Sequence, residues 1–292
     1  MKFSRSKKKC KFALLPEIHY LESQIKNITE KNYKKLSVQL SLHGLSFCSK
    51  DILSGNIIQF GHVDFESYPK NFTIENCIWK SFLVHDELTK SYDEIVVLHE
   101  NNLSAFVPKA FFDEDYKGSY LQYNTKVFET DFFTYDSLDN YEMVNVYVPY
   151  VNINNYLIDQ FGTFEYKHFS SVLVSKLLNL SKNDESKTMY VHVSKYHFEI
   201  VVIQNQKLLL YNSFEYKTPQ DFIYYILFTA EQLYMNPENF KLKLSGEISE
   251  HNPLYDAAYQ YIRNIELLNF EYSELKAVSV EDYRKNLVIF NV

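Results

Sequence analysis

Three apolar runs decide the fold of this chain: MYVHV at residues 189–193, FEIVVI at 198–203 and LLLYNSF at 208–214. Short polar turns, Ser194-Lys195-Tyr196 and Gln204-Asn205-Gln206, separate them. Apolar runs of this length between turn residues are typical of β-strands joined as hairpins. The sequence therefore predicts three consecutive antiparallel strands here.

A helix is predicted to follow these strands. It begins at Thr218-Pro219-Gln220-Asp221, where a threonine cap, a proline in the first turn and an acid three residues after the cap are typical of a helix start. A strand at 240–244 and a helix that begins at Asn252-Pro253 complete the unit. This half of the chain thus reads strand-strand-strand-helix-strand-helix.

The same order occurs about 150 residues earlier in the chain. Strands are predicted at 36–42, 45–48 and 57–65, an amphipathic helix from Ile74 to about Ser91, and a buried strand at 94–99. Two such units predict a duplicated α/β fold, with mixed sheets flanked by helices.

The joint between the two units is expected in the polar run 181–187. We expect a basic N-terminal lead-in over residues 1–33, a first domain over 34–184 and a second domain over 185–292. The end of the first unit is predicted to hold strands near 127–135 and 143–148, then helices near 152–161 and 169–180.

Charge is unevenly distributed along the chain. Six of the 30 basic residues lie in the first eleven positions, which leaves 24 basic against 37 acidic residues, a balance of −13 (Lys2, Arg5, Lys7, Lys8, Lys9 and Lys11). An acidic body repels phosphate backbones, so no nucleic acid partner is expected except through residues 2–11. That tail is interpreted as a solvated terminus, with RNA or an anionic membrane surface as the alternative contact.

Cysteine usage and hydropathy favour a cytoplasmic protein. The sequence has three cysteines, Cys10, Cys48 and Cys77, without a C-x-x-C pair, as suits a reducing compartment. No secretory signal and no apolar run long enough to span a membrane is predicted. The nine histidines are dispersed, so no metal site is expected.

The order of elements resembles that of the actin-like ATPase superfamily, whose two domains are ribonuclease H-like. It is most similar to the bacterial branch with the type IV pilus assembly protein, the cell-division actin homologue and the type II secretion scaffold. The runs LLLYNSF at 208–214 and LSGE at 244–247, with the capped helix between them, resemble the Bacteroidota domain-of-unknown-function family 3822. This resemblance covers roughly residues 36–270 and implies a fold without an assigned activity.

The resemblance implies that the nucleotide site is degenerate. ATP-binding members carry an acid and a glycine at the first hairpin of each half, where backbone amides approach phosphate and carboxylates order metal-bound water. The first hairpin here, SLHGLS at 41–46, keeps a glycine but no acid; the second, HVSKYH at 192–197, has neither. In the third segment, Ser245-Gly246-Glu247, one glycine of a pair remains. The cleft residues implied are Gly44, Ser46, Ser194, Gly246 and Glu247, with no cofactor and no catalytic residue.

Other polar residues give weaker signals. His43, His192 and His197 would face each other across a cleft as vestigial phosphate contacts, or be solvent-exposed turn residues, which is what we expect. The acidic runs 86–87 and 113–115 are interpreted as solvated helix ends, because adjacent acids do not converge on one substrate.

The aromatic content leaves two interpretations open. The chain has 25 Tyr and 23 Phe but only 6 Gly. Exposed rings, such as those of Tyr211, Phe214 and Tyr216, would form a protein-binding surface. The alternative, which we favour, places most rings in or beside the core.

The sequence supports a non-catalytic, actin-like cytoplasmic scaffold that binds a protein partner not identified by the sequence. An ATP-binding phosphotransferase or ATPase with rearranged phosphate loops is the enzyme alternative. It predicts that a bulkier residue at Gly44 or Gly246 abolishes activity while the fold remains. An RNA-associated factor using the lysine-rich tail is the third hypothesis.

Overall fold

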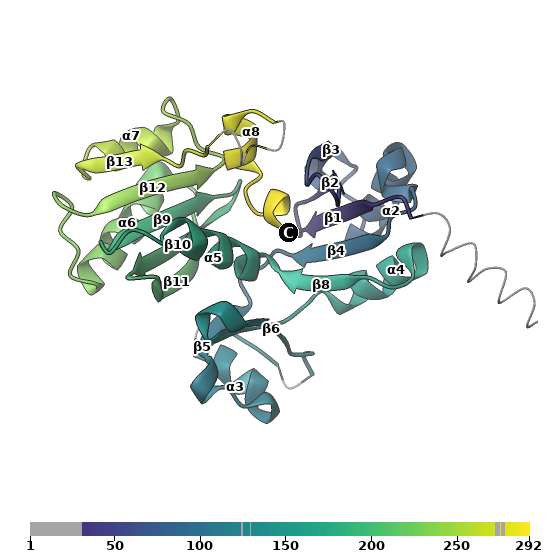
Figure 1. The fold of residues 1–292 in the computed structure, drawn as a ribbon, viewed down its shortest axis with the longest axis horizontal. Coiled ribbons are helices and arrows are strands. Elements are labelled where there is room, and N and C mark those ends of the chain that lie inside the picture. Colours follow the sequence, from purple (N-terminus) through teal and green to yellow (C-terminus); the bar gives the residue numbers. More distant parts are fainter. Residues whose placement is uncertain (1–30, 124, 129, 272–274, 276–277) are drawn as a thin grey trace, which may run out of the picture.

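Two five-stranded sheets form the frame of the protein (Figure 1). The computed structural model describes residues 31–292 except 124, 129, 272–274 and 276–277, so the basic tail and Cys10 lie outside the described residues. The first sheet contains β1 (Lys34–Leu40), β2 (Gly44–Asp51), β3 (Ile57–Asp64), β4 (Glu94–His99) and β8 (Glu165–His168). The second contains β9 (Thr188–Val193), β10 (His197–Gln204), β11 (Lys207–Glu215), β12 (Lys241–Gly246) and β13 (Asn264–Leu267).

The two sheets have the same topology. Their strand orders are β3-β2-β1-β4-β8 and β11-β10-β9-β12-β13. In each, the first three strands pair antiparallel and the next two join in parallel. The predicted duplication of a mixed-sheet unit is confirmed.

Each unit also contains helices. The first unit has α2 (Ile74–Val84), α4 (Val151–Phe161) and α5 (Phe169–Leu180), and the second has α6 (Pro219–Gln232), α7 (Pro253–Tyr259) and α8 (Val280–Lys285). At the start of α6, Thr218 Oγ1 accepts from Asp221 N at 3.2 Å, while Asp221 Oδ2 accepts from Thr218 N at 2.9 Å. The predicted cap is therefore formed by both side chains.

A third, smaller sheet interrupts the first unit between β4 and α4. It has the order β5-β7-β6, with β5 (Ser104–Pro108), β6 (Thr134–Leu138) and β7 (Met143–Tyr147), and is covered by α3 (Lys117–Leu121). The prediction of a strand near 143–148 is confirmed, whereas a strand over 127–135 is wrong, since β6 begins at Thr134. This sheet has its own apolar core, which includes Ala105, Val107, Leu121, Val144 and Val146.

One shared core fixes the two large sheets relative to each other. Helix α5 packs against Val96 and Leu98 of the first sheet and against Tyr190 and Val201 of the second. The last residues of the chain join the same core, and Figure 1 shows the C-terminus between the sheets. Lys50 Nζ on β2 donates to the Phe290 carbonyl at 2.8 Å, which anchors this segment. The joint between the sheets is thus a packed interface.

No helix within the described ranges is both long and apolar enough to cross a membrane.

Candidate functional site

A cavity of about 240 Å³ lies where the first hairpins of the two sheets face each other. Four of the five predicted cleft residues, Gly44, Ser46, Ser194 and Glu247, line it. The fifth, Gly246, precedes Glu247 at the end of β12. The strand topology therefore brings together residues that are about 200 positions apart in the sequence.

Two backbone amides of the first hairpin are hydrogen-bonded within the hairpin itself. Ser41 Oγ accepts from the backbone N–H of His43 at 3.2 Å and of Gly44 at 3.1 Å. A phosphate approaching this turn would have to compete with the Ser41 hydroxyl for both donors. Gly44 is also required by packing, since a Cβ there would lie 2.8 Å from the Val63 carbonyl oxygen of β3.

The segment after β12 is likewise bonded within the chain. Glu247 N donates to the Val193 carbonyl at 2.7 Å, and Gly246 has a φ of +86°. A Cβ at Gly246 would lie 2.1 Å from that same carbonyl oxygen. The glycine thus allows two backbones to approach closely, and no ligand is needed to explain its presence.

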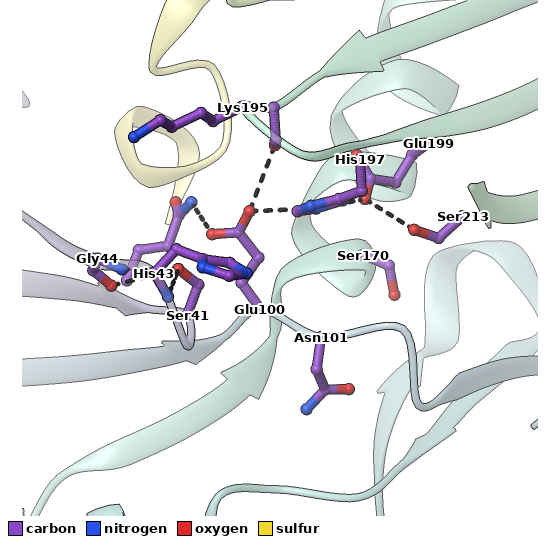
Figure 2. A network of polar contacts seen from close by, with 12 residues as sticks. Ser41, His43, Gly44, Glu100, Asn101, Ser170, Lys195, His197, Glu199 and Ser213 are labelled. Atoms are coloured by element: carbon purple, nitrogen blue, oxygen red, sulfur yellow. Dashed lines mark hydrogen bonds and ion pairs between the residues drawn. The ribbon is translucent and has the colours of Figure 1, made fainter. Parts of the chain in front are cut away.

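A carboxylate that the sequence analysis did not single out occupies the centre of the site. Glu100, directly after β4, accepts from Gln39 Nε2 at 2.8 Å and from Ser194 Oγ at 3.3 Å (Figure 2). His197 Nε2 lies 3.3 Å from Glu100 Oε1 and 3.1 Å from Glu199 Oε1. This network joins β1 and the end of β4 in the first sheet to β10 in the second.

The charged groups of this network shift one another's pKa values. Burial opposes the charged imidazole, but the adjacent Glu199 and Glu100 carboxylates outweigh it and raise the pKa of His197 well above its usual value of 6.5. Burial likewise opposes ionisation of Glu100, yet the hydrogen bond and charge of His197, with Gln39, lower the pKa of Glu100 to about 2. One imidazolium therefore lies between two carboxylates at neutral pH.

A second set of contacts joins the two units beside the cavity. Lys195 Nζ in the β9–β10 turn pairs with Asp64 Oδ2 at 2.7 Å and Glu66 Oε2 at 2.9 Å. The Tyr196 hydroxyl donates to Glu66, and the Tyr196 ring lies 4.4 Å from the His43 ring between centroids. The turn of the second unit thus contacts the first unit, and Tyr196 is part of the cavity lining.

The predictions for the histidines need correction. His192 is only 4% exposed and bonds Ser245 Oγ at 3.0 Å, and His197 is held by two carboxylates. The interpretation of both as solvent-exposed turn residues is wrong, because β12 and Glu100 pack over this hairpin. His43 is exposed, as expected, although its ring contacts Tyr196.

The acidic runs behave differently from each other. Residues 113–115 are exposed, in agreement with a solvated helix end, and Asp113 accepts from Asp115 N at 3.0 Å. Glu87 is 8% exposed and pairs with Lys90 Nζ at 2.5 Å, so the same interpretation of 86–87 is wrong for Glu87.

The remaining candidates show no catalytic arrangement. Cys48 and Cys77 are buried free thiols, and burial raises the pKa of Cys48 to about 11. Among the described residues, no group of three histidines, cysteines or carboxylates is placed to hold a metal ion. The cationic side chains that line the cavity are paired within the chain, including Lys285 with Glu247 at 3.3 Å.

The buried titratable groups predict how stability changes with pH. Burial lowers the pKa of His99 to about 4 and of His168 to about 3, so their contribution to stability decreases as pH falls below 6.5. The raised pKa of His197 gives stability that is present below 6.5 and is lost as pH rises through its folded-state value. We expect urea unfolding midpoints to be highest near neutral pH and to fall on both sides. In His197→Gln the alkaline fall should be reduced; an unchanged alkaline limb would contradict the assignment.

The fold defined by these two sheets is the actin-like fold. A protein from Bacteroides thetaiotaomicron, described as having an actin-like ATPase fold and unknown function, is similar with a TM-score of 0.74 at 23% identity, covering 82% of this chain and 92% of that chain. A chain of a PilM–PilN type IV pilus biogenesis complex has a TM-score of 0.51 at 11% identity, covering 88% and 97%. The resemblance expected from the sequence is confirmed at the level of fold.

The family described as Protein of unknown function (DUF3822) matches residues 23–265, and the chain belongs to it. No curated protein matches the sequence.

Proposed function

We propose that this chain is a non-catalytic actin-like protein that binds a protein partner, with its two sheets held at a fixed angle by the network around Glu100. The observation that carries the proposal is the state of the cleft. The turn amides of His43 and Gly44 and the amide of Glu247 are bonded within the chain, and the cationic side chains in the cleft are paired.

The size and charge of the cavity support the same conclusion. Sites for small molecules are usually about 300–1,000 Å³, and this cavity is about 240 Å³. The cations in its lining, Lys195, His197 and Lys285, are each paired with a carboxylate, so none is free to bind a triphosphate. A nucleotide that bound Lys195 would have to break its pairs with Asp64 and Glu66.

Similarity of fold also favours a partner-binding role. One protein with this fold is a chain of a PilM–PilN type IV pilus biogenesis complex, and a bound protein is the kind of partner we propose here. The likeness at 11% identity carries the fold only, so the partner itself has to be found by experiment.

The proposal predicts that ATP does not bind. Calorimetric titration of the full chain with ATP, with and without Mg²⁺, should give no saturable heat up to about 1 mM. Tyr196→Ala, which removes a ring from the cavity lining, should also fail to bind, because the loop amides remain bonded within the chain. Tyr234→Ala is a matched control, since Tyr234 is 97% exposed and lies outside the cleft. Micromolar ATP binding by the wild-type chain or by Tyr196→Ala would favour the enzyme alternative instead.

A further inference from the structure

A groove of about 640 Å³ lies between the inserted three-stranded sheet and the second large sheet. Its walls are β5 and β11, each of which is the last strand of its sheet. No strand pairing joins β5 to β11 among the described residues. Each wall of the groove is therefore the edge strand of a sheet. An edge strand has backbone N–H and C=O groups that can pair with an added strand.

The backbone of β11 presents hydrogen-bonding groups to this groove. Alternate residues of a strand direct N–H and C=O to opposite sides. Tyr216 N donates to the Tyr196 carbonyl at 3.2 Å, so in the antiparallel register Phe214 and Asn212 face β10. The groups of Tyr211 and Ser213 then face the groove; the Ser213 N–H meanwhile donates to the exposed Asn212 side chain at 2.9 Å, which an incoming strand would displace.

The backbone of β5 also presents hydrogen-bonding groups to the groove, from the opposite wall. Val148 N donates to the Leu103 carbonyl at 3.1 Å and Lys109 N to the Glu142 carbonyl at 2.8 Å. Odd-numbered residues of this strand thus face β7, and the groups of Ser104 and Phe106 face the groove. Both residues line it.

Side chains give the groove an apolar floor. The rings of Phe106 and Tyr211 meet edge-to-face with centroids 5.0 Å apart, so the two strands touch through side chains and leave their backbones apart. An extended segment with apolar side chains at alternate positions fits such a floor.

A buried carboxylate, that of Glu199, lies behind the lining residue Ser213. Ser213 Oγ donates to Glu199 Oε1 at 3.4 Å, and Glu199 Oε2, on a side chain that is 2% exposed, has no hydrogen-bond partner among the described residues. His197 is shared between Glu199 and Glu100, which leaves a net negative charge. Glu215 ends the same strand, and a cationic group on a bound segment would complement these carboxylates.

We propose that this groove binds an extended segment of a partner protein by strand addition, with apolar side chains at alternate positions and a lysine or arginine beside Ser213. This deepens the proposed function, because it names the surface and the chemistry of the partner.

A synthetic peptide panel tests the proposal on the full chain. The probe is a fluorescein-labelled peptide of eight residues that alternates valine and threonine and carries one lysine, placed at either end in separate peptides. One of the two should bind with a micromolar Kd. Its glutamate version should bind about tenfold more weakly, and so should a version with N-methylated backbone amides that cannot pair with a strand edge.

Variants locate the peptide on the protein. Leu209→Lys places a charge on the β11 edge, at a residue that is 43% exposed, and should weaken binding at least about tenfold. Leu53→Lys, at a 74% exposed residue in the β2–β3 turn, is the matched control and should bind as wild type. In hydrogen exchange, the peptide should protect the Tyr211 N–H, while the Asn212 N–H, already bonded to β10, should be protected in both states.

Two results would overturn this proposal. One is that neither lysine peptide binds, or that the lysine peptide binds no more tightly than its N-methylated version and binds Leu209→Lys as tightly as the wild-type chain. The other is a dimer of the full chain in sedimentation that Leu209→Lys dissociates, which would assign the groove to a second copy. Neither result bears on ATP binding, so the groove and the closed cleft are tested separately.

Discussion

His197→Ala is expected to lower the free energy of unfolding by about 3–5 kcal/mol at pH 7, as is typical when one partner of a buried ion pair is removed. The imidazolium of His197 lies 3.3 Å from Glu100 and 3.1 Å from Glu199. Without it, two nearby carboxylates face each other with little solvent, since Glu199 is 2% exposed and the Glu100 side chain 11%. The loss should be present at pH 5 as well, because the stabilisation by the raised pKa of His197 is complete below its unfolded-state value of 6.5.

Urea unfolding at pH 5 and pH 7 measures this effect. His251→Ala removes an exposed histidine and should change stability by less than about 0.5 kcal/mol. His197→Gln, which restores a hydrogen-bond donor without the charge, should recover only part of the loss. If His197→Ala is as stable as His251→Ala at pH 7, the network does not join the two sheets energetically.

The elements of the two repeated units follow from local sequence patterns. The apolar run at 94–99 forms β4 over Glu94–His99, and the capping residues Thr218 and Asp221 start α6 as predicted. These features are local, because a cap or an alternating pattern needs only its own few residues. Local patterns repeated in the same order were enough to predict the duplicated fold.

Of the inserted sheet, the strand near 143–148 was predicted, but β5 was not, because its signal is not local. Strand β5 has only five residues, Ser104–Pro108, and ends in a proline, so its pattern resembles a loop. It becomes a strand by pairing with β7, more than thirty residues later in the chain. The groove between β5 and β11 could not be foreseen for the same reason, since it depends on which strands end as edges.

The residues named from the sequence lie around one cavity, but the carboxylate that links them was missed. Gly44, Ser46, Ser194 and Glu247 line one cavity, yet Glu100, which bonds to residues of both units, carried no motif. One signal was present: Glu100 directly follows a buried strand, and the ends of parallel strands in such sheets meet at the crevice where sites form. Its partner His197 could be identified only from the register of the second hairpin.

Gly246→Ala is expected to destabilise the fold by at least about 4 kcal/mol, an exceptional loss for one methyl group. Two costs add here. A φ of +86° is unfavourable for alanine, by about 1–3 kcal/mol, and the new Cβ would lie 2.1 Å from the Val193 carbonyl oxygen. The overlap is with backbone of the adjacent strand β9, which cannot rotate away as a side chain could.

Gly162→Ala separates the two costs. Gly162 also has a positive φ, +75°, but nothing lies within 4 Å of its Cβ position, so only the backbone cost of about 1–3 kcal/mol applies. Urea unfolding of both variants should therefore show Gly246→Ala well below Gly162→Ala. Equal losses would mean that β12 shifts to admit a methyl group, and Gly246 would then be free to serve a ligand. If Gly246→Ala is instead much less stable than Gly162→Ala, a Gly246 variant loses its fold. The enzyme alternative requires the fold to remain, so a loss of activity in that variant cannot demonstrate a phosphate contact.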